Sequence, residues 1–180
     1  GHEVTLWSAI PAEIEEMAKT RTHKNLPGVT LPEGIIYTAD LEEAMKDKNL
    51  LVMAVPSVFV RSTAQKMKPF CKEGQLIVDV AKGIEENTLD TMTQIIKEEL
   101  PMAETAVLSG PSHAEEVGRK LPTTCVIGAT TRKTAEYLQS VFMSKVFRVY
   151  TSPDILGIEL GGSLKNVIAL AAGIADGLGY

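Results

Sequence analysis

LLVMAVPS, residues 50–57, contains six apolar residues in a row, followed by proline and serine. An uninterrupted apolar run of this length is typical of a strand that is buried on both faces of a parallel sheet. Pro56 ends the strand, and Ser57 is expected to cap a helix over 58–67. The stretch therefore predicts a sheet that is covered by helices on both sides.

The same strand-then-helix unit recurs on either side of this stretch. Before it, Asp40 and Glu43 form a D-x-x-E capping signal for a short helix. The alternation predicts an α/β fold, a doubly wound and mainly parallel Rossmann-like sheet. The further strands are expected at 2–7, 35–38, 75–80, 105–109, 123–127 and 147–151, and the further helices begin at 11, 41, 88, 113 and 131.

The C-terminal stretch, Asp154 to Tyr180, is almost entirely small or apolar and has one cation, Lys165. From Ser163 to Ala175 apolar or small residues occur all round, which is typical of a buried helix. A lysine in dry surroundings is a weaker base than usual and can exchange protons near neutral pH. The alternative is that Lys165 lies near a helix end and extends its head into water.

Composition excludes several classes of protein. The net charge is -5 and no basic face stands out, which argues against a nucleic-acid surface. Cys71 and Cys125 are isolated, so neither a disulfide framework nor a metal site is expected, and a reducing cytoplasm fits. The C-terminal stretch is apolar, but its glycines and Lys165 argue against a membrane span.

Ligands of such sheets bind outside the carboxyl ends of the strands. Lys82 stands at one such end beside Gly83, and Gly110 and Ser112 stand at another, where free amides and a hydroxyl could meet an anion. Phe59, with Arg61, could flank a cofactor. Each of these residues also has an alternative interpretation without a ligand. Lys82 could be a solvated loop lysine, and Gly110 with Ser112 could form a plain helix cap. Phe59 could be an ordinary core residue and Arg61 a solvated one.

Eight segments of the chain stand out, in this order: GHEVTLW, LPG, VPS, AKGIE, SGPSHAEEV, LPTT, FRVYTSPDILGIELGGSLKNVIALAAG and DGLG. Together, and in this order, they resemble the bacterial branch of the NAD(P)-dependent glycerol-3-phosphate dehydrogenase family. Within the resemblance, SGPSHA and GGSLKN with their wide mutual spacing are specific, whereas VPS or LPG alone is a weak signal.

The resemblance implies reversible hydride transfer between NAD(P)H and dihydroxyacetone phosphate, which gives sn-glycerol 3-phosphate for phospholipid synthesis. It makes Lys165 the catalytic proton donor and acceptor, and Lys82 a contact of both substrate and cofactor. Gly110 and Ser112 become substrate contacts. Pro56, Phe59 and Ala114 are assigned to the cofactor. The expected partner is this small molecule, and a homodimer is compatible with the family.

The chain also departs from the family pattern. It contains no G-x-G-x-x-G, so the first strand and glycine turn are expected before Gly1. Residues 1–153 are then a truncated dinucleotide-binding domain, and residues 154–180 are the first helices of an all-α substrate domain. We expect this piece to be inactive by itself. After Trp7 no carboxylate or cation marks the choice between NAD and NADP, because the sequence reads SAI (8–10).

Two other functions remain open. A β-hydroxyacid or ketopantoate-type dehydrogenase has the same architecture and a helix lysine, but needs no phosphate on its substrate. A non-catalytic dinucleotide-fold module would only bind or assemble. Two cations converging on one cleft, Lys82 and Lys165, speak against the second alternative.

Overall fold

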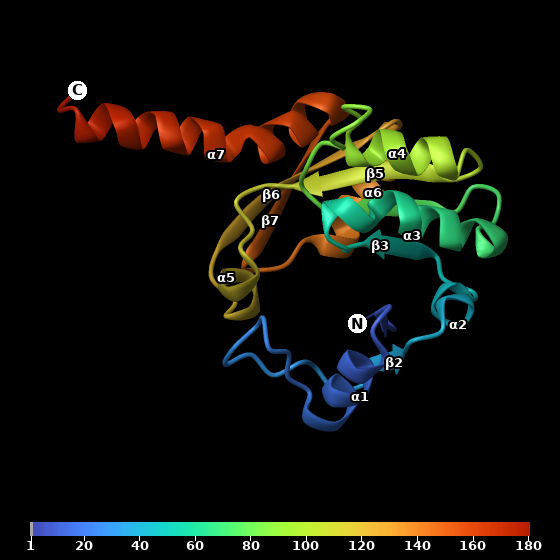
Figure 1. Ribbon diagram of the computed structural model, residues 1–180. Helices are drawn as coiled ribbons and strands as arrows, with labels where there is room; N and C mark the ends of the chain where they lie inside the picture. The colour runs from blue at the N-terminus through green and yellow to red at the C-terminus, as the bar shows by residue number, and fades with distance from the viewer. Residues whose placement is uncertain (1) are drawn as a thin grey trace.

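The computed structural model describes residues 2–180, and its strands form two separate sheets (Figure 1). Every strand pair is parallel except β5 with β6, which confirms the mainly parallel α/β fold. The two-stranded sheet has the order β1-β2, and the five-stranded sheet has the order β3-β4-β5-β6-β7. The strands are β1 (Thr5–Trp7), β2 (Ile36–Thr38), β3 (Leu50–Met53), β4 (Leu76–Asp79), β5 (Glu104–Ser109), β6 (Thr123–Ala129) and β7 (Phe147–Ser152).

Helices connect the strands, and local signals in the sequence set where several of them begin. Asp40 accepts a hydrogen bond from Glu43 N at 3.1 Å, which confirms it as the predicted cap, but the Glu43 side chain accepts from the Thr38 hydroxyl instead of from Asp40 N. Thr131 caps its helix in the same way, through Thr134 N. The α-helices are α1 (Pro11–Thr20), α2 (Leu41–Met45), α3 (Val60–Met67), α4 (Met92–Glu99), α5 (Ala114–Gly118), α6 (Arg132–Phe142) and α7 (Ile155–Gly177), with 3-10 turns η1 (Ser57–Phe59) and η2 (Lys68–Phe70).

Strand β4 divides the core into two layers, because successive side chains of a strand point to opposite faces. Ile77 packs with buried residues of α3 and α4 on one face. Leu76 and Val78 pack with buried residues of β5, β6 and α6 on the other. Asp79 follows Ile77 by two residues, so its carboxyl points toward the α4 layer at the carboxyl end of the strand.

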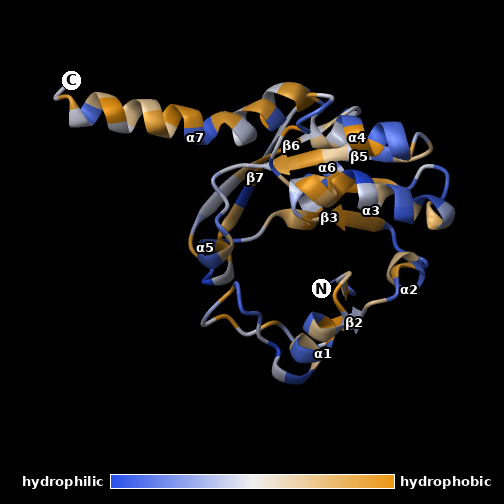
Figure 2. Cartoon of the chain, in the orientation of Figure 1, coloured by the Kyte–Doolittle hydropathy of each residue, from blue (hydrophilic) through white to orange (hydrophobic). Residues whose placement is uncertain are grey.

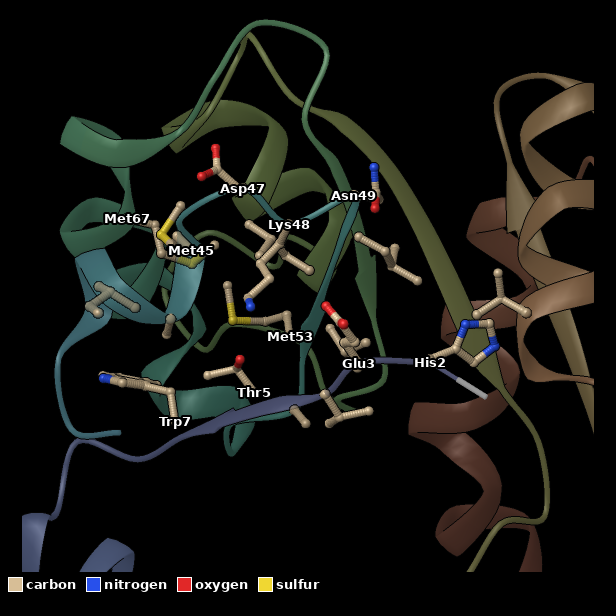
Figure 3. Close-up of a pocket in the computed structure, with 18 of the residues that line it drawn as sticks. His2, Glu3, Thr5, Trp7, Met45, Asp47, Lys48, Asn49, Met53 and Met67 are labelled. Carbon is tan, nitrogen blue, oxygen red and sulfur yellow. The ribbon is translucent and has the colours of Figure 1, made fainter. Parts of the chain in front are cut away.

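A groove of about 740 Å³ lies between β1 and β3, which do not pair with each other. Met45, Met53 and Met67 line it from three different elements (Figure 3). A dinucleotide-binding sheet has the strand order 3-2-1-4-5-6. The order β2-β1, groove, β3-β4-β5 reproduces this order with the groove at the position of its first strand.

Two predicted helix starts are wrong. The helix expected from residue 88 begins only at Met92, because Thr91 and Gln94 form a capping box there. Residues before it turn sharply instead, with Leu89 at a φ of 62°. Ser57 does not cap α3: its side chain makes no capping bond, and η1 precedes the helix.

Helix α7 is one continuous helix of 23 residues, and most of it is exposed, which corrects the prediction of a buried helix over 163–175. Figure 1 shows it extending away from the sheet, and Figure 2 shows hydrophobic residues along its length. Apolar faces are buried only where another element packs on them, and within residues 2–180 nothing covers this one. By length and composition alone, α7 is also apolar enough to cross a membrane.

Candidate functional site

The loop after β4 directs Lys82 across to the end of the neighbouring strand. The Lys82 ammonium donates a hydrogen bond to the backbone oxygen of Gly110 at 2.8 Å. The side chain is half-buried, and burial lowers its pKa, as does the nearby charge of Lys165. A lysine that titrates closer to neutral pH therefore lies between the ends of β4 and β5.

The turn after β5 needs glycine at position 110. A Cβ there would lie 2.5 Å from the backbone oxygen of Thr124, so any side chain would displace β6. The backbone N–H and the hydroxyl of Ser112 both donate to Gly110 O, at 2.9 and 3.3 Å. The structure thus brings three predicted substrate contacts, Lys82, Gly110 and Ser112, onto one carbonyl group.

Helix α7 passes close to this turn because residue 162 is glycine. A Cβ at Gly162 would lie 2.6 Å from the Ser109 hydroxyl and 3.7 Å from Cγ of Lys82. Lys165 follows one turn later, on the neighbouring part of the same face. Its side chain is exposed rather than buried, and its charge is near enough to contribute to the lowered pKa of Lys82.

The residues predicted to contact a cofactor lie around the same loop, on exposed surface. Gly83 packs so closely on the η1 turn that a Cβ would lie 2.7 Å from Cβ of Ser57. Pro56 precedes this turn, and Phe59 ends it with 56% of its surface exposed. Ala114 is exposed at the first position of α5, two residues after Ser112.

Arg61 is neither solvated nor a free ligand contact. Its guanidinium donates to both oxygens of Glu85, at 2.8 and 2.7 Å, and to Glu98 and Glu99 at 2.7 Å each. The hydrogen bond from Arg61 lowers the pKa of Glu85 to about 2. Because Glu85 stands three residues after Lys82, this ion cluster ties the Lys82 loop to α3 and α4.

Two buried carboxyl groups under the site were not predicted. Glu159 accepts hydrogen bonds from the Thr91 hydroxyl at 2.7 Å and from the N–H and hydroxyl of Thr93 at 2.8 and 2.6 Å. Asp79 is 0% exposed; one oxygen accepts from Ala81 N at 3.2 Å, and the other has no partner.

Burial, with a smaller contribution from the charge of Glu159, raises the pKa of Asp79 to about 8. The carboxyl is therefore mostly protonated at neutral pH. A signal for Glu159 was present in the sequence. It is an acidic residue within the same small and apolar stretch that singled out Lys165, and the argument applied to the lysine applies to it as well.

The end of β1 has charged groups that the sequence around residues 8–10 does not reveal. The Ser8 hydroxyl donates to Glu13 of α1 at 3.2 Å, and Lys24 pairs with the other oxygen of Glu13 at 3.0 Å. A carboxylate and a cation thus lie together beside this strand end. Among residues 2–180, no group of three or more histidine, cysteine or acidic side chains could hold a metal ion.

The strand order, with ligand-accessible glycine turns and two lysines at the strand ends, is that of the dinucleotide-binding α/β class of proteins. The chain belongs to the NAD-dependent glycerol-3-phosphate dehydrogenase family. The model of the family's N-terminus matches residues 1–135, and the model of its C-terminus matches residues 154–180.

Individual relatives agree with this assignment. The chain is 64% identical over its whole length to glycerol-3-phosphate dehydrogenase (NAD(P)+) of Agathobacter rectalis and 56% identical to that of Fusobacterium nucleatum. It superposes on the crystal structure of glycerol-3-phosphate dehydrogenase from Coxiella burnetii with a TM-score of 0.88 and 31% identity, over 98% of this chain and 54% of that one. The chain spans about half the length of these relatives, 54% and 55% for the two curated proteins.

Proposed function

We propose that the full-length protein transfers a hydride reversibly between NAD(P)H and dihydroxyacetone phosphate, giving sn-glycerol 3-phosphate for glycerophospholipid synthesis. The observation that carries the proposal is the hydrogen bond of 2.8 Å from the Lys82 ammonium to Gly110 O. It holds a cation across the ends of β4 and β5, where α7 brings a second cation, Lys165. A substrate with a phosphate and a carbonyl oxygen suits two cations at one strand edge.

The residues of this chain have separate tasks in the proposed reaction. Lys82 and the Gly110–Ser112 turn bind and orient the substrate at the strand ends. Lys165 stabilises the negative charge that grows on the carbonyl oxygen as hydride reaches the carbon, and then gives that oxygen its proton. In the reverse direction the neutral amine of Lys165 takes the hydroxyl proton back.

The residues around the Lys82 loop fit a dinucleotide cofactor. Pro56 and Phe59 form an exposed apolar surface beside a cation, and Gly83 lets backbone approach closely. This apolar surface and the Lys82 ammonium together suit the nicotinamide end of the cofactor, with its ribose and phosphate. Ala114 would then contact the cofactor from the side of the Gly110–Ser112 turn. When bound, the nicotinamide supplies or accepts the hydride.

The remaining assignments follow from the same proposal. Residues 1–153 serve as the dinucleotide-binding domain, and residues 154–180 begin a helical substrate domain that covers the apolar surface of α7. Protein rather than lipid then covers this helix, which is consistent with a cytoplasmic enzyme.

The direct test is a substrate panel with the full-length protein. Oxidation of NADH and of NADPH is followed by absorbance, with dihydroxyacetone phosphate, ketopantoate or a β-ketoacid as the acceptor. We expect turnover with dihydroxyacetone phosphate alone. Turnover with an unphosphorylated acceptor would favour the other dehydrogenases, and nucleotide binding without any turnover would favour a non-catalytic module.

Ser112→Ala in the full-length protein is expected to raise KM for dihydroxyacetone phosphate by about tenfold or more. The reason is that a hydrogen bond to a charged group contributes roughly 1.5–3 kcal/mol. KM for NADH should change much less. Ser140→Ala, which removes an exposed hydroxyl of α6, is the matched control. If both Michaelis constants of the Ser112 variant equal those of the wild type, Ser112 serves only the turn.

A further inference from the structure

Glu159 is the buried residue of α7: 7% of its surface is exposed, whereas the rest of this helix is half-buried or exposed. Its carboxylate lies at the beginning of α4, where Thr91 is the cap and Thr93 is in the first turn. A negative charge is favourable there because backbone N–H groups at a helix start have no partner within the helix. The position is therefore a specific attachment of α7 to the α/β domain.

The attachment uses both carboxylate oxygens. One oxygen accepts from Thr93 N at 2.8 Å, and the other accepts from the hydroxyls of Thr91 and Thr93 at 2.7 and 2.6 Å. An ionised carboxylate can accept all three bonds, whereas an amide offers a single oxygen. Burial chiefly raises the pKa of the nearby Asp79, and the charge of Glu159 adds to this effect, so this second buried acid lies close to the attachment.

Two further contacts of α7 lie within three residues of Glu159. Ile158 contacts Gly128 of β6 so closely that a Cβ on the glycine would lie 2.8 Å from Cδ1 of Ile158. Gly162 contacts Ser109 in the way described above. Contacts at 158, 159 and 162 fix both the rotation of the helix about its axis and its position along that axis. Lys165 lies one turn beyond Gly162, and its side chain makes no hydrogen bond or ion pair with any other residue of 2–180, so its place depends on these three contacts.

We propose that Glu159 is a positioning residue, whose three hydrogen bonds to Thr91 and Thr93 fix α7 so that Lys165 stands beside Lys82. The inference rests on the proposed function, in which Lys165 handles the proton. Glu159 touches neither substrate nor cofactor and acts only through the helix.

The test is Glu159→Gln in the full-length protein. We expect kcat to fall at least about tenfold, because misplacing a catalytic group by about 1 Å can cost about 10²-fold in rate. KM for NADH should stay within about twofold, since the cofactor contacts lie on other elements. Asp154→Ala is the matched control: it removes the cap of the same helix, a bond of 2.8 Å to Gly157 N, without touching α4. It should lower Tm but leave kcat nearly unchanged.

Thr93 supplies a second, independent variant in case Glu159→Gln does not fold. Thr93→Val removes one hydroxyl donor and should lower kcat, whereas Thr93→Ser keeps the donor and should restore it. In the double variant Thr93→Val/Glu159→Gln the losses in kcat should be less than additive, because both changes break one attachment.

Three results would overturn the proposal. The first is a Glu159→Gln enzyme with the kcat of the wild type, and the second is an Asp154→Ala enzyme that has the same Tm as Glu159→Gln and loses as much kcat. The third is an equal kcat in Thr93→Val and Thr93→Ser. Absence of dihydroxyacetone phosphate reduction by the wild-type protein would refute the proposed function instead. The attachment is then judged by amide hydrogen exchange over residues 155–165. Faster exchange in Glu159→Gln than in Asp154→Ala supports it, and equal exchange overturns it.

Discussion

Asp79→Asn is expected to stabilise the full-length protein by several kcal/mol at neutral and alkaline pH. Asp79 is completely buried, one of its oxygens has no partner, and burial raises its pKa from 3.8 to about 8. The folded protein therefore holds a proton that the unfolded chain releases. Asparagine has nearly the shape of the protonated acid and keeps an oxygen for Ala81 N, but it has no proton to release.

The sign of the pH dependence follows from proton binding. Between about pH 4 and about pH 8 the unfolded state binds fewer protons at this site than the folded state, so the free energy of unfolding falls as pH rises. Below that range the Asp79 contribution is fully present, and above it the loss is complete. Each pKa unit corresponds to about 1.4 kcal/mol, so the largest loss is on the order of 5 kcal/mol.

The measurement is urea unfolding of both proteins across this pH range. We expect the advantage of Asp79→Asn to grow from pH 5 to pH 8 and then to level off, by the linkage relation. Asp176→Asn, which changes an exposed aspartate of α7, should run parallel to the wild type. If Asp79→Asn also runs parallel to the wild type, the Asp79 carboxyl is ionised in the folded protein and has a partner there.

Lys165→Met in the full-length protein is expected to lower kcat by about 10²-fold or more, the range in which general acid–base catalysis contributes to rate. Methionine keeps the length and the apolar stem of the side chain and removes the charge and the proton. Affinity for NADH and Tm should change little, because Lys165 is exposed and α7 is held at other residues.

Steady-state kinetics, nucleotide titration and thermal unfolding of the same preparation check this expectation. Lys133→Met, an exposed lysine on α6, is the control for loss of a positive charge. A Lys165→Met enzyme that keeps more than about a tenth of wild-type kcat would reject the proton-transfer role, since acid–base catalysis is worth at least about 10²-fold.

The sequence predicted the architecture well because its signals are local. The cap at Asp40 was confirmed, and the apolar run at 50–55 forms a strand over Leu50–Met53. Its expected burial on both faces was wrong, because β3 is an edge strand beside the groove and Val52 is 48% exposed. The predicted start of α4 was wrong although Thr91 and Gln94 carried a capping signature, because Thr88, three residues before Thr91, also looked like a helix start. Nearby signals of similar strength cannot be ranked without knowing which turn the tertiary structure favours.

For the candidate site, the sequence predicted which cations, glycines and hydroxyls stand at the ends of the strands. The structure places Lys82, Gly110 and Ser112 together, and all three were chosen from the sequence. Asp79, Glu159 and the Arg61 ion cluster were not, because their importance depends on contacts between residues 24 to 80 positions apart in the chain. The burial of α7 was predicted wrongly because an apolar pattern does not specify what packs on it.

Because α7 is held by the close contact at Gly162, the position of Lys165 depends on the number of residues between 162 and 165 rather than on their side chains. An α-helix turns by about 100° per residue, so one inserted or deleted residue would swing Lys165 about a quarter of the way round the helix. A change of side chain at 163 or 164 leaves that angle as it is. In related sequences, the residues at 163 and 164 should therefore vary, whereas the number of residues between Gly162 and Lys165 should stay constant.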